Sequence, residues 1–248
     1  MKTVLITGCS SGFGLDTAKY FLDRGWKVIA TMRSPRLDLL PASDNLTVLP
    51  LDVTSDDSVQ QAIAAAGPID VLVNNAGIGW LNALEGTPID IAQSLFETNA
   101  LGTMRVTQAV LPQFRERKAG IIINVTSSVT MKPLPLLSVY TATKAAVNAL
   151  TESLALELAP HGIAVKIVLP GSAPDTSFAN TALSRLKEQG GFPEAYGDFA
   201  NGVLTAMRTP GAPKTLSSDV AEAVWRAAND PSAPTRIPAG ADAVALAS

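Results

Sequence analysis

Residues 3–14 decide the fold, and they read Thr3-Val4-Leu5-Ile6-Thr7-Gly8-Cys9-Ser10-Ser11-Gly12-Phe13-Gly14. A short apolar run leads into a glycine-rich turn, and residues 15–24 then carry apolar side chains at helical spacing. Glycines at a strand-to-helix junction let backbone N–H groups approach a pyrophosphate, whose charge the helix N-terminus favours. An ordinary glycine turn would have the same composition, but its place at the first strand-to-helix junction favours dinucleotide binding.

Further apolar runs alternate with helical patterns along the chain. The runs are near-continuous in Val, Ile and Leu, as expected of parallel strands buried on both faces. The alternation predicts an α/β fold, a Rossmann-like doubly wound parallel sheet, and the lack of a linker predicts one domain over residues 1–248. Ser55 or Thr54 is the expected N-cap of the second helix and Ser218 of the last. The expected strands cover residues 27–32, 46–51, 69–73, 121–125, 163–169 and 235–238, and the later helices residues 56–66, 100–117 and 219–228.

The bulk composition excludes several classes of function. The chain has 248 residues, a formal charge of −3 and a pI near 5.2, which argues against a nucleic-acid or anionic-membrane surface. Its one cysteine, Cys9, allows no intrachain disulfide, and the first apolar run is too short for a signal peptide. No stretch approaches the roughly 20 apolar residues of a membrane span. We therefore expect a soluble, cytoplasmic protein without a membrane or nucleic-acid partner, and we find no metal-ligand spacing.

A second stretch, residues 138–150, carries the candidate chemistry. It reads as a helix from Tyr140 onward, and a spacing of four residues puts Tyr140 and Lys144 on one face. A phenol beside a fixed ammonium is a potential proton donor, because the cation favours the phenolate and lowers the pKa of the tyrosine. Both residues are common, so this spacing alone would also fit a structural accident. The other motifs of the chain have to decide between the two.

The glycine turn resembles the Thr-Gly-x-x-x-Gly-x-Gly cofactor motif of the short-chain dehydrogenase/reductase family, and further motifs follow in that family's order. Asn74-Asn75-Ala76-Gly77 is similar to the family's Asn-Asn-Ala-Gly, and Ser127 lies 13 residues before Tyr140, as the family's catalytic serine does. Asn99 matches the family's catalytic asparagine. The resemblance covers residues 1 to about 172. It implies a Rossmann-fold oxidoreductase that uses a nicotinamide cofactor.

The resemblance also implies roles for the catalytic residues Asn99, Ser127, Tyr140 and Lys144. Tyr140 would exchange a proton with the substrate oxygen, and Ser127 would hydrogen-bond the same oxygen. Lys144 would lower the pKa of Tyr140 and hold the nicotinamide ribose. Asn99 would hold a water that links Lys144 to solvent, with a helix N-cap as the alternative interpretation of this asparagine.

Cofactor contacts follow from the same resemblance, with Asp52-Val53 beside the adenine and Pro170-Gly171 beside the nicotinamide. The residues that we expect to bind the cofactor are Gly8, Ser10, Ser11, Gly12, Phe13, Gly14, Arg33, Asp52, Val53, Asn75, Ala76, Gly77, Tyr140, Lys144, Pro170 and Gly171. An acid at the end of the second strand would bind the ribose 2′-hydroxyl of NAD, but this strand ends Met32-Arg33. Arg33 can form a forked contact to a phosphate, and Ser10 can add a hydroxyl. The sequence therefore favours NADP(H) over NAD(H), unless Arg33 is only a solvated loop charge.

Residues 171–217 are expected to form a helical substrate lid. They depart from the family's Pro-Gly-x-x-x-Thr, because Thr176 comes one residue late in Pro170-Gly171-Ser172-Ala173-Pro174-Asp175-Thr176. Apolar residues in and around the lid predict a pocket for a neutral, largely apolar ketone or secondary alcohol, although some of them must only pack the lid. These residues are Trp80, Leu81, Leu134, Leu136, Leu137, Phe178, Phe192, Tyr196 and Phe199.

Two alternative functions remain open. A 3-oxoacyl-thioester reductase would need a basic entrance for the carrier phosphate, and the lid's Arg185, Lys187, Arg208 and Lys214 are scattered. A non-catalytic, dinucleotide-sensing binding protein would be indicated by the loss of Tyr140 or Lys144, and both are present. The NADP(H)-linked carbonyl reductase therefore stands first.

The expected partners are a small-molecule carbonyl or alcohol and a second copy of the chain. Residues 142–158 are apolar almost all round the expected helix, so that helix should be covered on both sides. One side can face the chain's own sheet and the other a symmetry mate, which predicts a homodimer or homotetramer.

Overall fold

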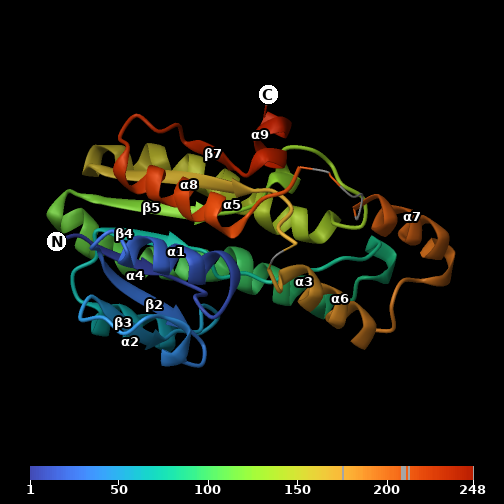
Figure 1. The fold of residues 1–248 in the computed structure, drawn as a ribbon, viewed down its shortest axis with the longest axis horizontal. Helices are drawn as coiled ribbons and strands as arrows, with labels where there is room; N and C mark the ends of the chain where they lie inside the picture. The colour runs from blue at the N-terminus through green and yellow to red at the C-terminus, as the bar shows by residue number, and fades with distance from the viewer. Residues whose placement is uncertain (175, 208–210, 212, 248) are drawn as a thin grey trace.

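The computed structural model describes residues 1–174, 176–207, 211 and 213–247, so Asp175 and Arg208 lie outside the described part. Strands paired in parallel form one sheet in the order β3-β2-β1-β4-β5-β6-β7 (Figure 1). The chain leaves β1 in one direction and continues from β4 in the other, so the carboxyl ends of these strands form the switch point at which such sheets place a ligand-binding crevice. The strands are β1 Thr3–Ile6, β2 Lys27–Met32, β3 Leu46–Pro50, β4 Val71–Asn74, β5 Gly120–Val125, β6 Ile163–Pro170 and β7 Arg236–Ala239.

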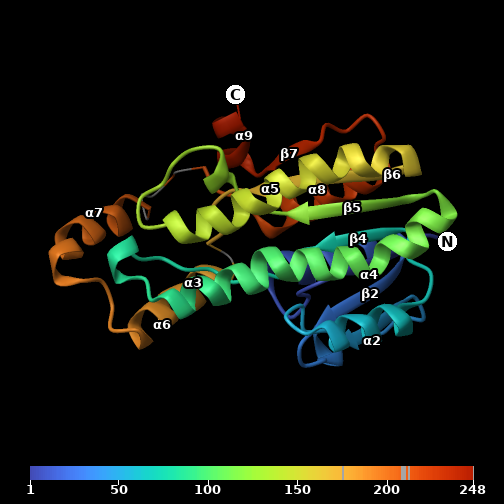
Figure 2. The same ribbon diagram turned by 180° about the vertical axis from the view of Figure 1, so that it is seen from behind.

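Helices cover both faces of the sheet. Helices α1 and α8 pack together on one face, and α2, α4 and α5 lie on the other (Figures 1 and 2). The predicted doubly wound sheet is thereby confirmed, with every expected strand placed within two residues. The helices are α1 Gly12–Leu22, α2 Asp56–Ala66, α3 Ile89–Phe96, α4 Gly102–Arg117, α5 Ser138–Leu158, α6 Phe178–Glu188, α7 Gly197–Met207, α8 Ser217–Asn229 and α9 Ala241–Ala247.

The near-continuous apolar strands serve two cores at once. In β1, Val4 and Ile6 pack towards α1 and α8, whereas Leu5 packs among the side chains under α2, α4 and α5. All three are fully buried. Burying such a side chain stabilises the fold by roughly 1.5 to 3 kcal/mol, so the sheet needs apolar residues on both faces of its central strands.

Three predicted helix features are wrong in detail. The first helix starts at Gly12, because the glycine turn itself enters the helix, and it ends at Leu22. The helix expected from residue 100 continues back through a π-helical turn into α3. Ser218 lies inside α8, whose N-cap is Leu216, and the Leu216 N–H donates to Asp219 at 2.8 Å. Ser55 does cap α2, because its hydroxyl oxygen accepts from the Ser58 N–H at 3.2 Å.

The lid helices α6 and α7 extend beyond the carboxyl edge of the sheet, and α6 lies beside α3 (Figures 1 and 2). A small apolar cluster formed by Leu81, Ala83, Leu136 and Ala200 joins the lid to the loops before α3 and α5. Within the described residues, no helix combines the length and the apolar character needed to cross a membrane.

Candidate active site

Ser127, Tyr140 and Lys144 meet where β5 ends and α5 begins. Ser127 follows β5 directly, and its Oγ accepts from the Val129 N–H at 3.3 Å. The Ser127 hydroxyl hydrogen-bonds the phenol of Tyr140, so residues 13 positions apart in sequence come into contact. Less than a tenth of each of the three side chains is exposed. The structure thus brings together a hydroxyl, a phenol and an amine in a largely dry setting, where their interactions are stronger than in water.

The protonation of this group differs from the sequence-based prediction. Burial raises the pKa of Tyr140, and the hydrogen bond with Ser127 lowers it by less. Lys144 Nζ lies 6.0 Å from the Tyr140 ring centroid and donates to the Val125 carbonyl oxygen at 3.1 Å. Burial lowers the pKa of Lys144 itself to about 8. The predicted lowering of the Tyr140 pKa by Lys144 is therefore wrong for the chain by itself, because desolvation dominates the shift and Lys144 is not among its causes. Tyr140 is protonated at neutral pH, the state that can donate.

Asn99 lies in the π-helical turn Glu97–Leu101 between α3 and α4, so the N-cap alternative is wrong. Its Oδ1 accepts from the Ile78 N–H at 2.8 Å, and its Nδ2 donates to the Ile78 carbonyl at 3.0 Å and to Thr143 Oγ1 at 3.1 Å. A Cβ added at Gly77 would lie 3.2 Å from Asn99 Oδ1 and 3.4 Å from Lys144 Nζ. The side chain therefore ties the loop after β4 to α5 beside Lys144. Wide turns of this kind inside helices occur frequently at functional sites.

The glycine turn fits a dinucleotide. Gly8 has a φ of +76°, and a Cβ on it would lie 2.9 Å from the Ala76 Cα, closer than a side chain can approach. A Cβ on Gly14 would collide with the Gly8 carbonyl oxygen and with Asn75 Nδ2, which donates to the Thr7 carbonyl at 2.9 Å. The turn therefore packs closely against Asn75 and Ala76. Such a cradle lets backbone N–H groups approach a phosphate closely.

The remaining predicted residues of the turn are more open. Ser10 and Ser11 are exposed, and Gly12 and Phe13 are half-buried. Ser11 Oγ lies 3.4 Å from the hydroxyl of Ser177 in the lid, and the late Thr176 packs beside Gly12. The lid thus reaches the glycine turn despite the altered spacing after Pro-Gly.

Cys9 points away from this open side. It is fully buried, and its thiol donates to the Ile6 carbonyl at 3.3 Å. Burial raises the pKa of the thiol to about 12. A thiol in this state is a packing residue rather than a nucleophile.

The predicted adenine and phosphate contacts lie at the ends of β2 and β3. Arg33 is exposed directly after β2. The Asp52 carboxylate accepts from the Thr54 N–H at 2.9 Å and from its hydroxyl at 2.8 Å, and these bonds, with a smaller effect of Arg33, lower the pKa of Asp52. Val53 is buried, and its carbonyl accepts from Arg105 at 3.4 Å. Arg33, Asp52 and Val53 therefore share the edge on which the glycine turn opens.

Pro170 and Gly171 close β6, next to β5 and its Ser127. A Cβ on Gly171 would collide with both carboxylate oxygens of Asp242, in the first turn of α9. Sequence reasoning missed Asp242, because an isolated acid some 70 residues downstream of Gly171 carries no signal of its own. Only the pairing of β6 with β7 brings it to this edge.

The residues of the predicted apolar pocket divide into two groups. Trp80 is a buried packing residue whose indole N–H donates to Thr87 at 2.9 Å, and Phe192 and Tyr196 pack on the cluster around Leu81. The Phe178 ring instead lies 5.7 Å from the Tyr140 ring, centroid to centroid, and remains 40% exposed. Phe178 is thus the lid aromatic that lies against Tyr140.

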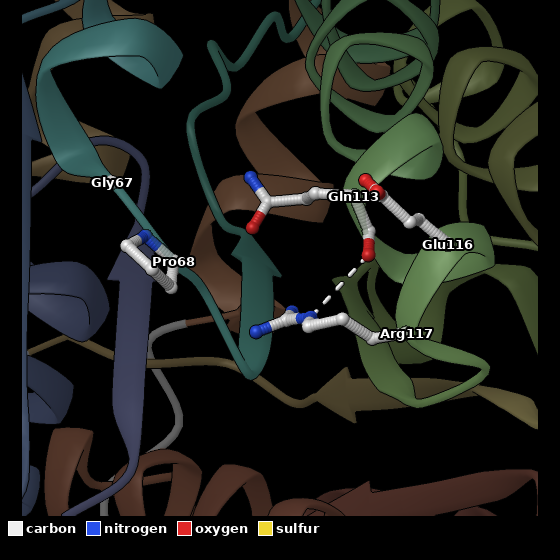
Figure 3. Close-up of a pocket in the computed structure, with 5 residues that line it drawn as sticks. All are labelled: Gly67, Pro68, Gln113, Glu116 and Arg117. Atoms are coloured by element: carbon white, nitrogen blue, oxygen red, sulfur yellow. Dashed lines mark hydrogen bonds between the residues drawn. The ribbon is translucent and has the colours of Figure 1, made fainter.

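A hollow of about 330 Å³ lies far from this group, at the opposite end of β4 (Figure 3). Two of its polar side chains bind backbone: Gln113 Oε1 accepts from the Ile69 N–H at 2.9 Å, and Arg117 donates to the Gln113 carbonyl at 3.3 Å. The side chains that could carry out chemistry therefore lie at the carboxyl edge of the sheet rather than at this hollow. Among the described residues, no group of three His, Cys, Asp or Glu side chains could hold a metal ion.

Comparisons with known proteins agree on the class of this chain. Residues 2–186 match a family model described as short chain dehydrogenase. Human retinol dehydrogenase 8 is 38% identical over 196 residues, which cover 75% of this chain and 63% of that protein. A short-chain dehydrogenase from Streptomyces avermitilis has a TM-score of 0.83 at 33% identity, over 99% of this chain and 90% of that one. The closed form of serine dehydrogenase complexed with NADP+ has a TM-score of 0.81 at 30% identity, over 96% and 94%.

The curated relatives are longer than the matched segment. The alignments span 69%, 63% and 58% of the lengths of three of them.

Proposed function

The chain belongs to the short-chain dehydrogenase family and is an oxidoreductase of that family, and from this premise we propose that it transfers hydride between NADP(H) and a neutral, largely apolar ketone or secondary alcohol. The observation that carries the proposal is the contact between Ser127 and Tyr140 beside Lys144, at the carboxyl edge that holds the glycine cradle. Ligands of open α/β sheets bind at this edge.

The cofactor would be held along the crevice between β1 and β4. Backbone N–H groups of the turn from Gly8 to Gly14 would bind the pyrophosphate, and Arg33 would bind the 2′-phosphate. Lys144 would hold the nicotinamide ribose. When bound, the nicotinamide supplies or accepts the hydride. The choice of NADP(H) is supported by the exposed Arg33 and by the NADP+ in the serine dehydrogenase complex.

The chain's own residues would move the proton. Tyr140, protonated because burial raises its pKa, donates to the carbonyl oxygen in reduction. Ser127 donates a hydrogen bond to the same oxygen and stabilises its developing negative charge. Lys144, with a pKa of about 8, gains and loses protons readily near neutral pH and can restore the proton of Tyr140. Asn99 keeps the loop after β4 in place beside Lys144.

An apolar substrate is supported by the lid. Phe178 presents a partly exposed ring beside Tyr140, and Leu134 is 37% exposed in the loop before α5. The relative named retinol dehydrogenase 8 acts, by its name, on an apolar alcohol. A neutral group beside these side chains loses little on desolvation, whereas an unpaired charge there would be costly.

We also propose a homodimer or homotetramer. The outward face of α5 is exposed at small apolar residues and at Leu156, which is 79% exposed, and Met104 on α4 adds to the exposed apolar surface. A monomer in light scattering at micromolar concentration would contradict this assembly.

The reaction is tested with a panel of ketones, aldehydes and 3-oxoacyl thioesters, each with NADPH and with NADH, by following the loss of cofactor absorbance. Turnover of apolar ketones with NADPH supports the proposal. Preference for thioesters would make the chain a 3-oxoacyl-thioester reductase. Tight cofactor binding without turnover of any carbonyl or alcohol would indicate a binding protein, and absence of cofactor binding would overturn the proposal altogether.

A further inference from the structure

The two ends of the lid meet at one carboxylate. Ser172, at the start of the lid, donates its N–H to Asp242 Oδ2 at 2.6 Å. Thr215, near the end of the lid, has its hydroxyl 2.6 Å from Asp242 Oδ1. Asp242 itself belongs to α9, outside the lid. One side chain therefore holds segments that lie more than 40 residues apart in sequence.

Thr215 extends this contact into the sheet. It is fully buried, its Oγ1 accepts from the Gly171 N–H at 3.0 Å, and it lies 2.9 Å from the Ala239 carbonyl. Its own N–H donates to the Ser172 carbonyl at 2.9 Å. Because Pro170 pairs with Ala239, these bonds sit on the carboxyl ends of β6 and β7. Thr215 thus connects the backbone on both sides of the lid.

Two glycines make room for the arrangement. A Cβ on Gly171 would collide with the Asp242 carboxylate. Gly240, with a φ of +94°, would place a Cβ on the Thr215 hydroxyl. The close approach at both positions shows that the Asp242 and Thr215 side chains fill space that an ordinary residue would occupy.

We propose that Asp242 and Thr215 form a clamp that positions the backbone from Pro170 to Ser172 for the nicotinamide half of the cofactor. Asp242 acts through Ser172 and Thr215 as a positioning residue. The inference rests on the proposed function. The clamped backbone follows β6, the neighbour of the strand that carries Ser127, whereas Arg33 and Asp52 lie across the sheet after β2 and β3. Loss of the clamp should therefore weaken binding of the nicotinamide half of the cofactor and leave binding of the adenine half unchanged.

The experiment compares two ligands on Asp242→Ala. The first is NADPH, and the second is adenosine 2′,5′-bisphosphate, which carries the adenine and the 2′-phosphate but no nicotinamide. Both dissociation constants are measured by titration calorimetry. Removing the hydrogen bonds of Asp242 with Ser172 and Thr215 should weaken NADPH binding by about tenfold. Binding of the fragment should stay within about twofold, since its contacts do not involve β6.

Conservative variants supply the matched controls. Asp242→Asn should keep near-wild-type NADPH binding, because the amide can accept from Ser172 with its oxygen and donate to Thr215 with its nitrogen. Thr215→Ser keeps the hydroxyl, whereas Thr215→Val removes it at nearly constant volume and should reproduce the loss in Asp242→Ala. The threonine pair keeps the proposal testable if Asp242→Ala does not fold. In ligand-free protein, limited proteolysis should cut the lid faster in Thr215→Val than in Thr215→Ser.

Three results would overturn the clamp. The first is an equal loss of affinity for both ligands, which would indicate general damage to the fold. The second is no change in the affinity for either ligand. The third is an Asp242→Asn variant that binds NADPH as weakly as Asp242→Ala does. That result would mean that the negative charge of Asp242, rather than its hydrogen bonds, supports NADPH binding. A wild-type protein that binds NADPH but turns over no substrate would defeat the proposed reaction alone, because the two binding constants still test the clamp. A protein that binds neither NADPH nor NADH would overturn both.

Discussion

The glycine turn and the lid use glycine in opposite ways. A Cβ added at Gly8 would collide with the Ala76 backbone, and one added at Gly14 would collide with the Gly8 carbonyl oxygen and Asn75 Nδ2. In the lid, Gly190, Gly191 and Gly197 have no atom within 4 Å of an added Cβ. The turn is therefore fixed by close backbone contacts within the chain, whereas the lid is held by side-chain contacts such as its apolar cluster and leaves these three glycines open.

The largest expected effect tests the catalytic side of this comparison. Tyr140→Phe should lower turnover by about 10² to 10⁴-fold, because general acid–base catalysis contributes an effect of that size, while the cofactor dissociation constant stays nearly constant. The lid supplies a matched control in Tyr196→Phe, which loses an exposed hydrogen bond to Glu85 and should change turnover by only a few-fold. Steady-state kinetics with a rate-limiting chemical step measures both. Retention of more than about a tenth of turnover in Tyr140→Phe would remove Tyr140 from the mechanism.

The second effect concerns the buried ammonium. The pKa of Lys144 falls from 10.5 in the unfolded chain to about 8, so the protonated form opposes folding. Below pH 8 this cost is fully present, and between pH 8 and 10.5 the unfolded state binds more protons, so stability rises with pH. Lys144→Met should therefore be more stable than wild type at pH 7, by on the order of 3 kcal/mol, and the difference should vanish above pH 10.5.

Urea unfolding of both proteins across this pH range measures the difference, and other titrating groups cancel in the comparison. The exposed lid residue offers the control: Lys187→Met should change stability by less than about 0.5 kcal/mol at every pH. A wild-type protein more stable than Lys144→Met at pH 7 would mean that Lys144 makes favourable contacts that outweigh its desolvation.

The third effect concerns the cofactor phosphate. A hydrogen bond to a charged group contributes about 1.5 to 3 kcal/mol, so Arg33→Ala should raise the NADPH Michaelis constant about ten- to hundredfold and leave the NADH value unchanged. Met32→Asp should invert the preference, because a carboxylate accepts from a 2′-hydroxyl and repels a phosphate. Arg185→Ala in the lid should alter neither constant. Equal weakening of both cofactors by Arg33→Ala would show that Arg33 only supports its loop.

The smallest expected effect isolates the glycines themselves. Gly14→Ala should destabilise the fold by about 1 to 3 kcal/mol, because the new methyl group meets the Gly8 carbonyl and Asn75. Gly197→Ala, at the open start of α7, should lie within about 0.5 kcal/mol of wild type. Thermal melts of the two variants give the answer. Equal melting temperatures would mean that the glycine turn can rearrange to accept the added methyl group. Steric contacts would then not distinguish the turn from the lid.

The sheet and the closeness of Ser127, Tyr140 and Lys144 could be predicted from the sequence because those residues carry local signals. Continuous apolar runs report burial on both faces, and Ser127, Tyr140 and Lys144 lie at a spacing that a strand end and a helix start can bring together. The turn around Asn99 was missed because an extra residue in a helical turn depends on contacts with Ile78 and Thr143, far away in sequence. Trp80 was assigned to the pocket because hydrophobicity does not distinguish a lining residue from a packing residue. The pKa of Tyr140 required the burial that only the folded chain shows.

The buried thiol of Cys9 gives this protein a practical advantage for measuring lid motion. It is the chain's only cysteine, it has no exposed surface, and its pKa of about 12 leaves almost no thiolate at neutral pH. A cysteine introduced by Ser184→Cys, on the exposed side of α6, would therefore be the only site that a maleimide dye labels rapidly. Fluorescence from that single dye could report opening and closing of the lid in otherwise native protein, without replacing any residue of the glycine turn.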